Sequence, residues 1–364
     1  MRPVLHHYGI TRVARQTGLD TIGIPCYAAI RPNSRTLAVH QGKGADDIAA
    51  QLSAIMEAVE FAIAEAPTAS ATVRSIGELN AAGLVSLVRA QSLPRGYEMD
   101  HSARFAWVTG QCLATGRSVQ VPLESVALAP NSTDPWPFSQ SSNGLGAGFS
   151  QQEATVHALC ELIERDASTL WSVRSLRRCA ATAIALHDMK DPSVRQCLAK
   201  TSDAGFQMRA FDLTTDIGVP VVMVLLWSSR PRYYFDVASG VCAHPSAIKA
   251  LVGAIEEAAQ TRISNITGAR DDIDPAEYGL PLPSWIAELI GEQDRGQRPV
   301  PASMPEVDFV GLPDRMKGQT VVVPLSREGE AVSVVKLLSD TLEDRSTNPH
   351  WRPGPRAIRA MTLP

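Results

Sequence analysis

The stretch SQQEATVHALCELIERD at residues 150–166 predicts a helix with one acidic face. Helical periodicity brings every third or fourth residue to the same side. The residues of this face, at i, i+4, i+8 and i+11, are Glu153, His157, Glu161 and Glu164. Like charges at this spacing destabilise an isolated helix, so a positive group must compensate. Arg165 and a divalent cation are the two compensating groups that the sequence suggests.

The same pattern, x-Ala-(Ile/Leu)-x-Glu-x-x-(Glu/Gln), occurs in residues 53–60, 157–164 and 253–260. Its anchoring glutamates are Glu57, Glu161 and Glu257, which stand 104 (57 to 161) and 96 (161 to 257) residues apart. These spacings are too long for a solenoid repeat. Three solvated surface helices are the simpler interpretation, but three copies with alanine at a fixed offset favour one shared acidic site. We therefore expect three large units, each contributing one helix to a shared centre.

Composition and charge limit the classes of protein to which the chain can belong. The chain has 364 residues, of which 45% are hydrophobic and 20% charged, so one large or two modest domains are expected. The net charge is −4 and no Lys/Arg run is present, which argues against a nucleic-acid partner. The longest apolar run, residues 219–227, is interrupted by Pro220 and is too short to span a membrane.

The six cysteines are scattered without a Cys-x-x-Cys pair. This distribution argues for reduced thiols in a cytoplasmic protein, and against a zinc site or a disulfide scaffold. The first ten residues, MRPVLHHYGI, also lack the apolar core of a signal peptide.

Strand and helix patterns alternate along the chain, with both hairpins and crossovers. The fold class we predict is therefore α/β (α+β), with mixed β-sheets layered with helices. Expected strands lie at 22–30, 37–40, 106–122 (a hairpin), 207–213, 219–227, 233–237, 319–325 and 331–338. Expected helices lie at 46–65, 150–166, 170–204 and 245–266, whereas 240–244 is expected to be a loop and 279–305 a Pro-rich linker or excursion.

Two glycine-rich stretches precede acidic helices. Gly-Lys43-Gly is too short for a Walker A loop, yet its backbone amides and ammonium can hold a phosphate. The stretch from Ser141 to Gly148 leads into the central helix, and its glycines at 144, 146 and 148 have the wrong spacing for a dinucleotide fingerprint. Ser150 and Glu153 also satisfy a capping box, so Glu153 is assigned equally to helix capping and to ligand binding.

The acidic positions suggest Mg²⁺–ATP chemistry. Glutamates at i and i+3 on separate helices supply the oxygen ligands that Mg²⁺ prefers, and Mg²⁺ usually bridges carboxylates and nucleotide phosphates. Positive charge for a triphosphate is available from Lys43, Arg165, Arg262 and Arg270. Gln260 can donate a hydrogen bond without adding negative charge.

The chain resembles the YcaO superfamily, whose members are ATP-dependent enzymes that phosphorylate peptide backbone amides. The motifs that carry the resemblance span roughly residues 19–272 and are Gly-Lys43-Gly, Ser53-x-x-x-Glu57-x-x-Glu60, Ser142-Asn143-Gly, Glu161-x-x-Glu164-Arg165-Asp, Glu257-x-x-Gln260 and Gly268-x-Arg270-Asp-Asp. The segment GLDTIGIP…RPNSRTL is similar to the branch found beside TfuA-type partner proteins, which is associated with peptide thioamides and trifolitoxin-like products. The resemblance implies one YcaO-type catalytic domain over residues 1–364, with a central ATP site and C-terminal strands and tail at 306–364.

The resemblance also implies a reaction. A nucleophile adds to a backbone carbonyl of a ribosomally made peptide, the oxyanion takes the γ-phosphoryl group of ATP, and collapse expels phosphate. A Cys, Ser or Thr side chain would give an azoline, and external sulfide would give a thioamide. The cofactors implied are ATP and Mg²⁺, and the partners are a precursor peptide or protein substrate, a TfuA-like protein and a second copy of the chain.

Residue roles carry over motif by motif. The expected Mg²⁺ ligands are Glu57, Glu60, Glu161, Glu164 and Glu257. The nucleotide contacts expected from the motifs and the residue chemistry together are Lys43, Ser53, Ser142, Asn143, Glu153, Arg165, Gln260, Arg262 and Arg270. Catalysis is assigned to Glu161, Glu164, Arg165 and Glu257.

Three departures from the family pattern are relevant. Phe61 stands where many relatives have arginine, and Phe149 where a small or polar residue is commoner. The Pro-x-Pro-x-Pro ending of azoline-forming relatives is absent, which favours the TfuA-type branch. No fused leader-binding domain is expected, so peptide recognition would need a partner or direct binding. The alternatives are an azoline-forming cyclodehydratase, a different enzyme use of the same site, and a non-catalytic nucleotide-binding scaffold that activates a partner.

Overall fold

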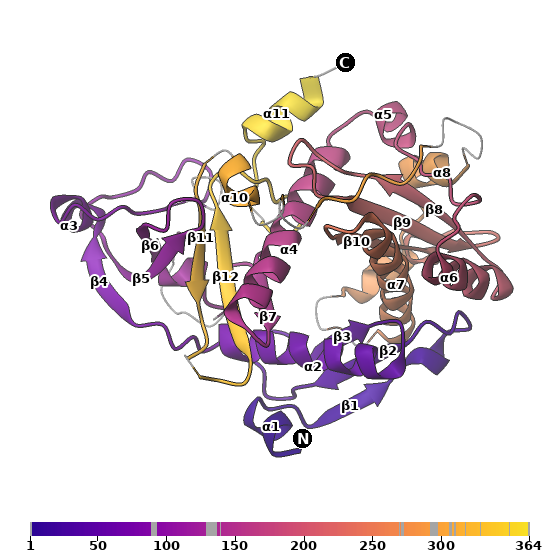
Figure 1. Cartoon of the computed structure of the whole chain (residues 1–364), viewed down its shortest axis with the longest axis horizontal. Helices are drawn as coiled ribbons and strands as arrows, with labels where there is room; N and C mark the ends of the chain where they lie inside the picture. Colours follow the sequence, from indigo (N-terminus) through magenta and orange to yellow (C-terminus); the bar gives the residue numbers. More distant parts are fainter. Residues whose placement is uncertain are drawn as a thin grey trace. The chain divides into compact units, whose positions relative to one another are not determined.

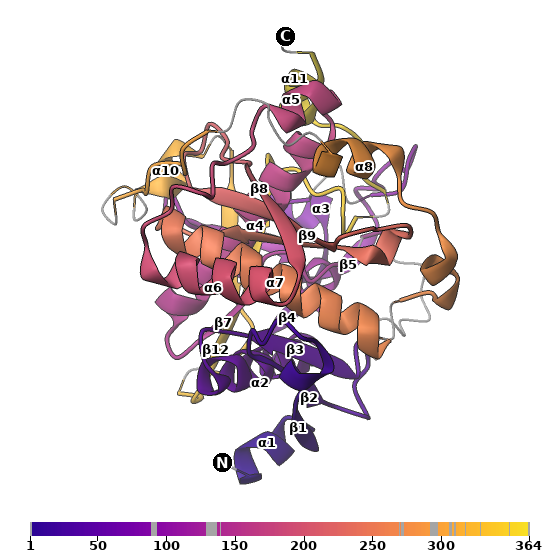
Figure 2. The same cartoon turned by 90° about the vertical axis from the view of Figure 1, so that its right-hand side faces the viewer.

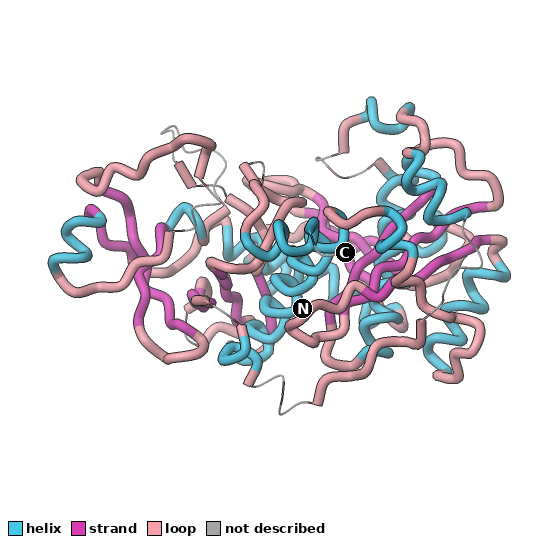
Figure 3. The backbone as a smooth tube through the Cα atoms, turned by 90° about the horizontal axis from the view of Figure 1, so that it is seen from above, coloured by secondary structure: helices cyan, strands magenta, loops and turns pink. Residues whose placement is uncertain are grey.

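The computed structural model has mixed sheets layered with helices, as the sequence predicts (Figure 1). It describes residues 2–88, 93–128, 137–138, 140–268, 270, 273–291, 298–305, 308, 311–316, 318–327, 329–348 and 350–362. The chain divides into two compact units. Figure 3 shows the helices of the chain in cyan and its strands in magenta. Unit 1 comprises Met1–Asn33, Leu37–Ala58 and Trp171–Phe309, and unit 2 comprises Ser34–Thr36, Val59–Leu170 and Val310–Pro364. A single catalytic domain over 1–364 stays a prediction.

Unit 1 contains two three-stranded antiparallel sheets. The first has the order β1 (Arg12–Arg15), β2 (Cys26–Ile30), β3 (Val39–Lys43), and the second β10 (Val237–Ala243), β9 (Val221–Ser228), β8 (Phe206–Asp212). Helices α6 (Pro192–Asp203) and α7 (Ala247–Thr267) pack on one face of the second sheet (Figure 2). The core between sheet and helices includes Val224, Leu226 and Leu251, so the continuous apolar run of β9 is a buried strand, as predicted.

Unit 2 contains one six-stranded antiparallel sheet. Its order is β4 (Ala71–Ser75), β5 (Arg104–Cys112), β11 (Thr320–Pro324), β12 (Ser333–Ser339), β7 (Leu145–Gly148), with β6 (Ser118–Pro122) also paired to β5. The β7–β12 pairing joins Gly148 to Ser333 and Leu145 to Lys336. Helix α4 (Gln151–Ser172) follows β7 directly. Trp107 is fully buried in this unit and donates through Nε1 to the Arg74 carbonyl at 2.8 Å.

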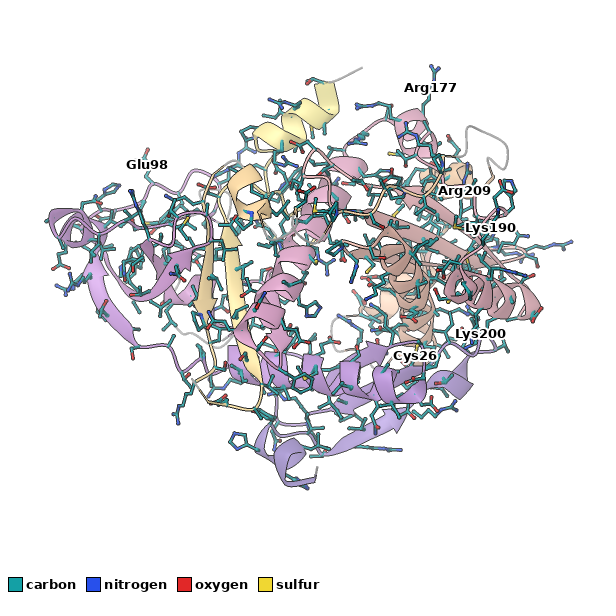
Figure 4. All side chains as sticks on the ribbon, in the orientation of Figure 1. Cys26, Glu98, Arg177, Lys190, Lys200 and Arg209 are labelled. Carbon is teal, nitrogen blue, oxygen red and sulfur yellow. The ribbon has the colours of Figure 1, made fainter. Side chains whose placement is uncertain are left out.

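The remaining elements are shorter, apart from α2 (Asp47–Ala64), which crosses the boundary between the units. In unit 1 they are α1 (Arg2–His7), η1 (Thr17–Leu19), α5 (Leu176–Ala180), η4 (Tyr234–Asp236), η5 (Pro275–Gly279) and α8 (Ser284–Gly291). In unit 2 they are α3 (Ile76–Ala81), η3 (Leu123–Ser125), α10 (Leu312–Arg315) and α11 (Pro355–Thr362). Arg209 of β8, labelled in Figure 4, donates to the Leu289 carbonyl and so ties α8 to the second sheet.

The three acidic helices begin in the same way. Asp46, Ser150 and Ser246 each accept a hydrogen bond from the backbone amide three residues later, at 2.8, 3.1 and 3.4 Å. Each cap stands eleven residues before an anchoring glutamate (46 to 57, 150 to 161 and 246 to 257). Because eleven residues make about three helical turns, the glutamate emerges on the side of the helix that carries the cap.

A glycine in the strand before each helix lets the two backbones approach closely. A Cβ on Gly42, Gly146 or Gly240 would lie 2.0–2.8 Å from backbone atoms of α2, α4 or α7. The facing helix residues are alanines in all three places: Ala50 and Ala54, Ala154 and Ala158, and Ala254 and Ala258. The repeat found in the sequence is therefore a repeated strand–helix unit, in which small residues bring helix and strand together.

Several predicted boundaries are wrong, and glycine is the main reason. Gly-Lys43-Gly was expected to be a loop, but Gly42 and Lys43 belong to β3, and residues 145–148 form β7. The predicted strand at 233–237 is mostly the 3-10 helix η4, and the predicted loop at 240–244 is mostly β10. Gly42, Gly146, Gly148 and Gly240 suggested turns, whereas the structure uses them for close packing. Residues 233–237 contain no glycine, so that wrong prediction has a different origin.

Two helical predictions also differ from the structure. The expected helix over 170–204 is divided between the end of α4, α5 and α6, with Asp191 capping α6 ahead of Pro192. The linker expected at 279–305 contains α8. No helix among the described residues combines the length and apolar character that a membrane crossing requires.

Addition of one methyl group at Gly240 tests the packing of strand against helix. We expect Gly240→Ala to lower the free energy of unfolding by about 1–3 kcal/mol, because its Cβ would lie 2.3 Å from the Ala254 carbonyl oxygen. Gly18→Ala is the matched control, since nothing lies within 4 Å of that position. Denaturant unfolding of both variants measures the difference, and equal stability would contradict a role for the glycine in helix–strand packing.

Candidate functional site

In unit 1, Lys43 and Glu257 form an ion pair. Lys43 is the last residue of β3, and its Nζ lies 2.7 Å from Glu257 Oε2 on α7. The two side chains are 26% and 31% exposed, so water still reaches the pair. The structure thus brings together one predicted phosphate contact and one predicted Mg²⁺ ligand that are 214 residues apart in the chain.

Glu256 is a second carboxyl group near Lys43 that sequence reasoning missed. Its burial raises its pKa, while the charges of Lys43 and Lys200 act in the opposite direction. Glu256 directly precedes Glu257, and its place in the helical pattern did not distinguish it from a surface residue. Lys43 therefore acts on two neighbouring carboxyl groups of α7.

Glu57 is held by the first sheet of unit 1. The backbone amide of Gln41 in β3 donates to Glu57 Oε2 at 3.2 Å. The Gln41 side chain in turn accepts from Ser264 on α7 and donates to Gln16 at 3.1 Å. Gln41 is 3% exposed. Its side chain links β3 to α7, and its backbone amide holds the Glu57 carboxylate of α2.

The other predicted contacts of unit 1 have varied surroundings. Ser53 is half-buried one helical turn before Glu57, and Gln260 is half-buried one turn after Glu256 on α7. Arg262 instead forms an ion pair with Asp20 at 3.2 Å and lies over the Phe206 ring at 4.4 Å from its centroid. These contacts give Arg262 a structural role that the sequence did not suggest, and its role as a nucleotide contact stays a prediction.

In unit 2, Glu161 lies beside the glycine-rich stretch that precedes α4. The Gly144 amide donates to Glu161 Oε2 at 3.1 Å, and Arg165 Nη2 lies 3.7 Å from Oε1. Burial raises the pKa of Glu161, and the nearby charges of Arg165, Lys336 and His157 counteract that shift. Lys336 was not predicted, because a lysine in a strand pattern normally points to solvent.

Asn143 is the most constrained of the predicted nucleotide contacts. It is 5% exposed, and its Nδ2 donates to Asp344 Oδ2 at 2.9 Å. Since Asp344 accepts this hydrogen bond, the amide nitrogen faces Asp344 and the Oδ1 oxygen faces away. Oδ1 is buried without a hydrogen-bond partner among the described residues. An unsatisfied buried acceptor is costly, so it fits a ligand that supplies a donor.

Glu153 caps the N-terminus of α4. Its carboxylate accepts from the Phe149 amide at 2.9 Å, and its own amide donates to Ser150. Glu153 and His157 are exposed, whereas Glu161 and Glu164 are half-buried on the same helix. The acidic face therefore runs from solvent at the N-terminus of α4 into unit 2. Glu60 on α2 is 9% exposed, Ser142 is half-buried beside Asn143, and Arg270 after α7 is half-buried.

The donor set suits Mg²⁺ together with a nucleotide. The predicted ligands are all carboxylates, which are the groups that Mg²⁺ prefers. Among the residues that the structure describes, no three His, Cys, Asp or Glu side chains gather closely enough to hold a metal alone. Mg²⁺ commonly completes its coordination with water and substrate phosphates. Sharing of one site by Glu57, Glu161 and Glu257 stays a prediction.

Comparisons with known proteins identify a family. The family model described as YcaO cyclodehydratase, ATP- and Mg²⁺-binding, matches residues 41–326. An uncharacterised protein from the tfuA 3′ region of Rhizobium leguminosarum bv. trifolii is 33% identical over 99% of this chain and 90% of its own length. An uncharacterised protein of Methanothermobacter thermautotrophicus is 32% identical over 74% of this chain and 70% of its own length.

Solved structures share the fold. YcaO from Methanopyrus kandleri, bound with AMPPCP and Mg²⁺, has a TM-score of 0.73 and 21% identity, covering 97% of this chain and 92% of that one. The E. coli microcin synthetase McbBCD complex with pro-MccB17 bound has a chain with a TM-score of 0.69 and 16% identity, covering 91% of this chain and 88% of that one. These likenesses confirm the predicted fold class.

The half-buried carboxyl group of Glu161 gives a pH-dependent prediction for metal-free protein. A raised pKa means that the folded chain holds the proton to higher pH than the unfolded chain. Stability therefore falls as pH rises above the ordinary glutamate value of about 4.5. We expect Glu161→Gln to match wild type near pH 4 and to have the higher melting temperature at pH 8. Glu98→Gln, at an exposed position labelled in Figure 4, should show no such divergence. A Glu161→Gln protein that melts below wild type at pH 8 would contradict this assignment.

Proposed function

Because this chain belongs to the YcaO family, we propose that it uses ATP and Mg²⁺ to activate a backbone amide of a ribosomally made peptide. ATP and Mg²⁺ are the ligands that the family description names, which confirms the predicted cofactors. The observation that carries the proposal is the arrangement around Glu161 and Asn143. There a half-buried carboxylate and an unsatisfied buried acceptor share one short segment of backbone.

The residues of each unit would have distinct tasks. Glu161 and Glu164 in unit 2, and Glu57 and Glu257 in unit 1, would ligate Mg²⁺, which neutralises phosphate charge when bound. Lys43 would exchange its contact with Glu257 for a phosphate oxygen, since an ammonium can serve either partner. Arg165 would stabilise negative charge that develops in the transition state.

The proposed reaction is an acyl-type substitution. A nucleophile adds to the amide carbon, and the resulting oxyanion attacks the γ-phosphorus of ATP with loss of ADP. Breaking of the carbon–oxygen bond then releases inorganic phosphate. The chain's residues position the reacting atoms and offset charge, and the peptide and nucleophile supply the bonds that change.

We favour sulfide as the nucleophile, which makes the product a thioamide. The relative encoded in a tfuA 3′ region supports this branch over cyclodehydration. An azoline, formed by a Cys, Ser or Thr side chain of the peptide, is the alternative product. A TfuA-like protein is the partner that this placement favours.

Removal of Glu161 tests nucleotide binding. We expect Glu161→Ala to weaken binding of the ATP analogue AMPPCP in the presence of Mg²⁺ by about 100-fold or more, since outer-shell changes alone cost about 10–100-fold. Calorimetry measures the affinity, circular dichroism checks the fold, and Glu98→Ala is the control at an exposed carboxylate. Unchanged affinity in Glu161→Ala would remove this residue from the site.

The mass of the product tests the reaction. Co-expression with a precursor peptide encoded nearby should give a gain of about 16 Da if sulfur replaces oxygen, or a loss of about 18 Da if an azoline forms. The mass of the modified peptide distinguishes the two. ATP turnover that does not depend on peptide, with an unmodified product, would favour a nucleotide-binding scaffold instead.

A further inference from the structure

Lys336 is a buried lysine at the centre of unit 2. It lies on β12, next to β7, and is 1% exposed. A lysine is almost never fully buried unless its charge has partners. Its ammonium donates to the carbonyl oxygens of Ser141 and Asn143, the latter at 2.7 Å. Two of its three donors therefore hold the backbone on either side of Ser142.

Two side chains that follow β12 in the chain, Asp344 and Thr347, hold the same segment. Thr347 Oγ1 lies 2.6 Å from Ser141 Oγ, which accepts in turn from the Asn143 amide at 3.0 Å. Asp344, 3% exposed, accepts from both Asn143 Nδ2 and Thr347 Oγ1. The backbone of residues 141–144 is thus fixed by a lysine, an aspartate and a threonine from one segment far along the chain.

The constraint has a direct effect on Asn143. Rotation of its amide would direct Nδ2 away from Asp344 and leave a buried carboxylate oxygen short of a donor. Asp344 therefore keeps Asn143 Oδ1 turned away from itself, buried and unsatisfied among the described residues. Lys336 fixes the Asn143 carbonyl and with it the backbone from which that side chain projects.

We propose that Lys336 is a positioning residue that, with Asp344 and Thr347, presents Asn143 Oδ1 to a hydrogen-bond donor of the bound nucleotide. The proposal rests on the function proposed above. Lys336 does not itself touch the nucleotide. Its ammonium also lies close enough to Glu161 to affect the charge of that carboxyl group.

The test measures affinity for AMPPCP with Mg²⁺, and separately KM for ATP and for the peptide, in two variants. Lys336→Met keeps the length of the side chain and removes both hydrogen bonds. Thr347→Val keeps the shape of a half-buried side chain and removes the hydrogen bonds that its hydroxyl makes with Ser141 and Asp344. We expect affinity losses of about 10–100-fold for Lys336→Met and about threefold or more for Thr347→Val, with KM for the peptide unchanged.

Two further measurements separate positioning from stability. The double variant should lose less affinity than the product of the two single losses, because both side chains hold one segment. Lys190→Met removes an exposed lysine outside the candidate site, labelled in Figure 4, and should leave affinity for AMPPCP unchanged. If Lys336→Met does not fold, Thr347→Val alone decides the question.

The results distinguish a failure of the proposed function from a failure of the positioning role of Lys336. A wild-type chain that does not bind AMPPCP would overturn the proposed function. Wild-type binding with unchanged affinity in the folded variants, or equal increases in KM for ATP and for the peptide, would overturn the positioning role alone.

Discussion

The close approach of strand and helix is the constraint on which the rest of the structure depends. Where Gly42, Gly146 and Gly240 meet alanines, the two backbones are nearly in contact, and a side chain at the glycine position would clash with the helix backbone. The approach fixes how each helix lies along its strand. The cap fixes the residue at which the helix begins. The glutamate eleven residues later therefore emerges on the side of the helix that carries the cap. Acidic side chains become site residues here because small residues elsewhere determine their position.

Electrostatics complements this geometry within each unit. Lys43 faces Glu257 and affects Glu256 in unit 1, and Arg165 and Lys336 offset the burial of Glu161 in unit 2. Carboxylates in such surroundings destabilise the folded protein when they are charged and have no bound cation, because burial disfavours the charged form. A divalent cation bound by these carboxylates would relieve that effect, so the arrangement that destabilises the free protein would favour metal binding.

Much of the fold could be predicted from periodicity. The three long helices, the buried strand β9 and the β5–β6 hairpin all have strong patterns, and the structure contains them. Short strands with glycine, such as β7 and β10, could not be recognised, since glycine signals a turn unless its packing partner is known. The acidic residues were identified from their repeat. Lys336, Asp344 and Glu256 were not, because their importance arises from long-range pairing that a local pattern does not encode.

The pairing of β7 with β12 has a consequence for how the protein is made. Residues 145–148 find their strand partner only at residues 333–336, and the ammonium that fixes residues 141–143 arrives on the same strand. Contacts between such distant positions form slowly, because a long loop must close first. While the ribosome is still adding the last part of the chain, α4 can already be helical and Glu161 can hold the Gly144 amide. Residues 141–143 still lack the contacts that Lys336, Asp344 and Thr347 provide. The nascent protein thus completes the contacts of residues 141–143 only at the end of translation, and until then the exposed edge of β7 is open to wrong partners.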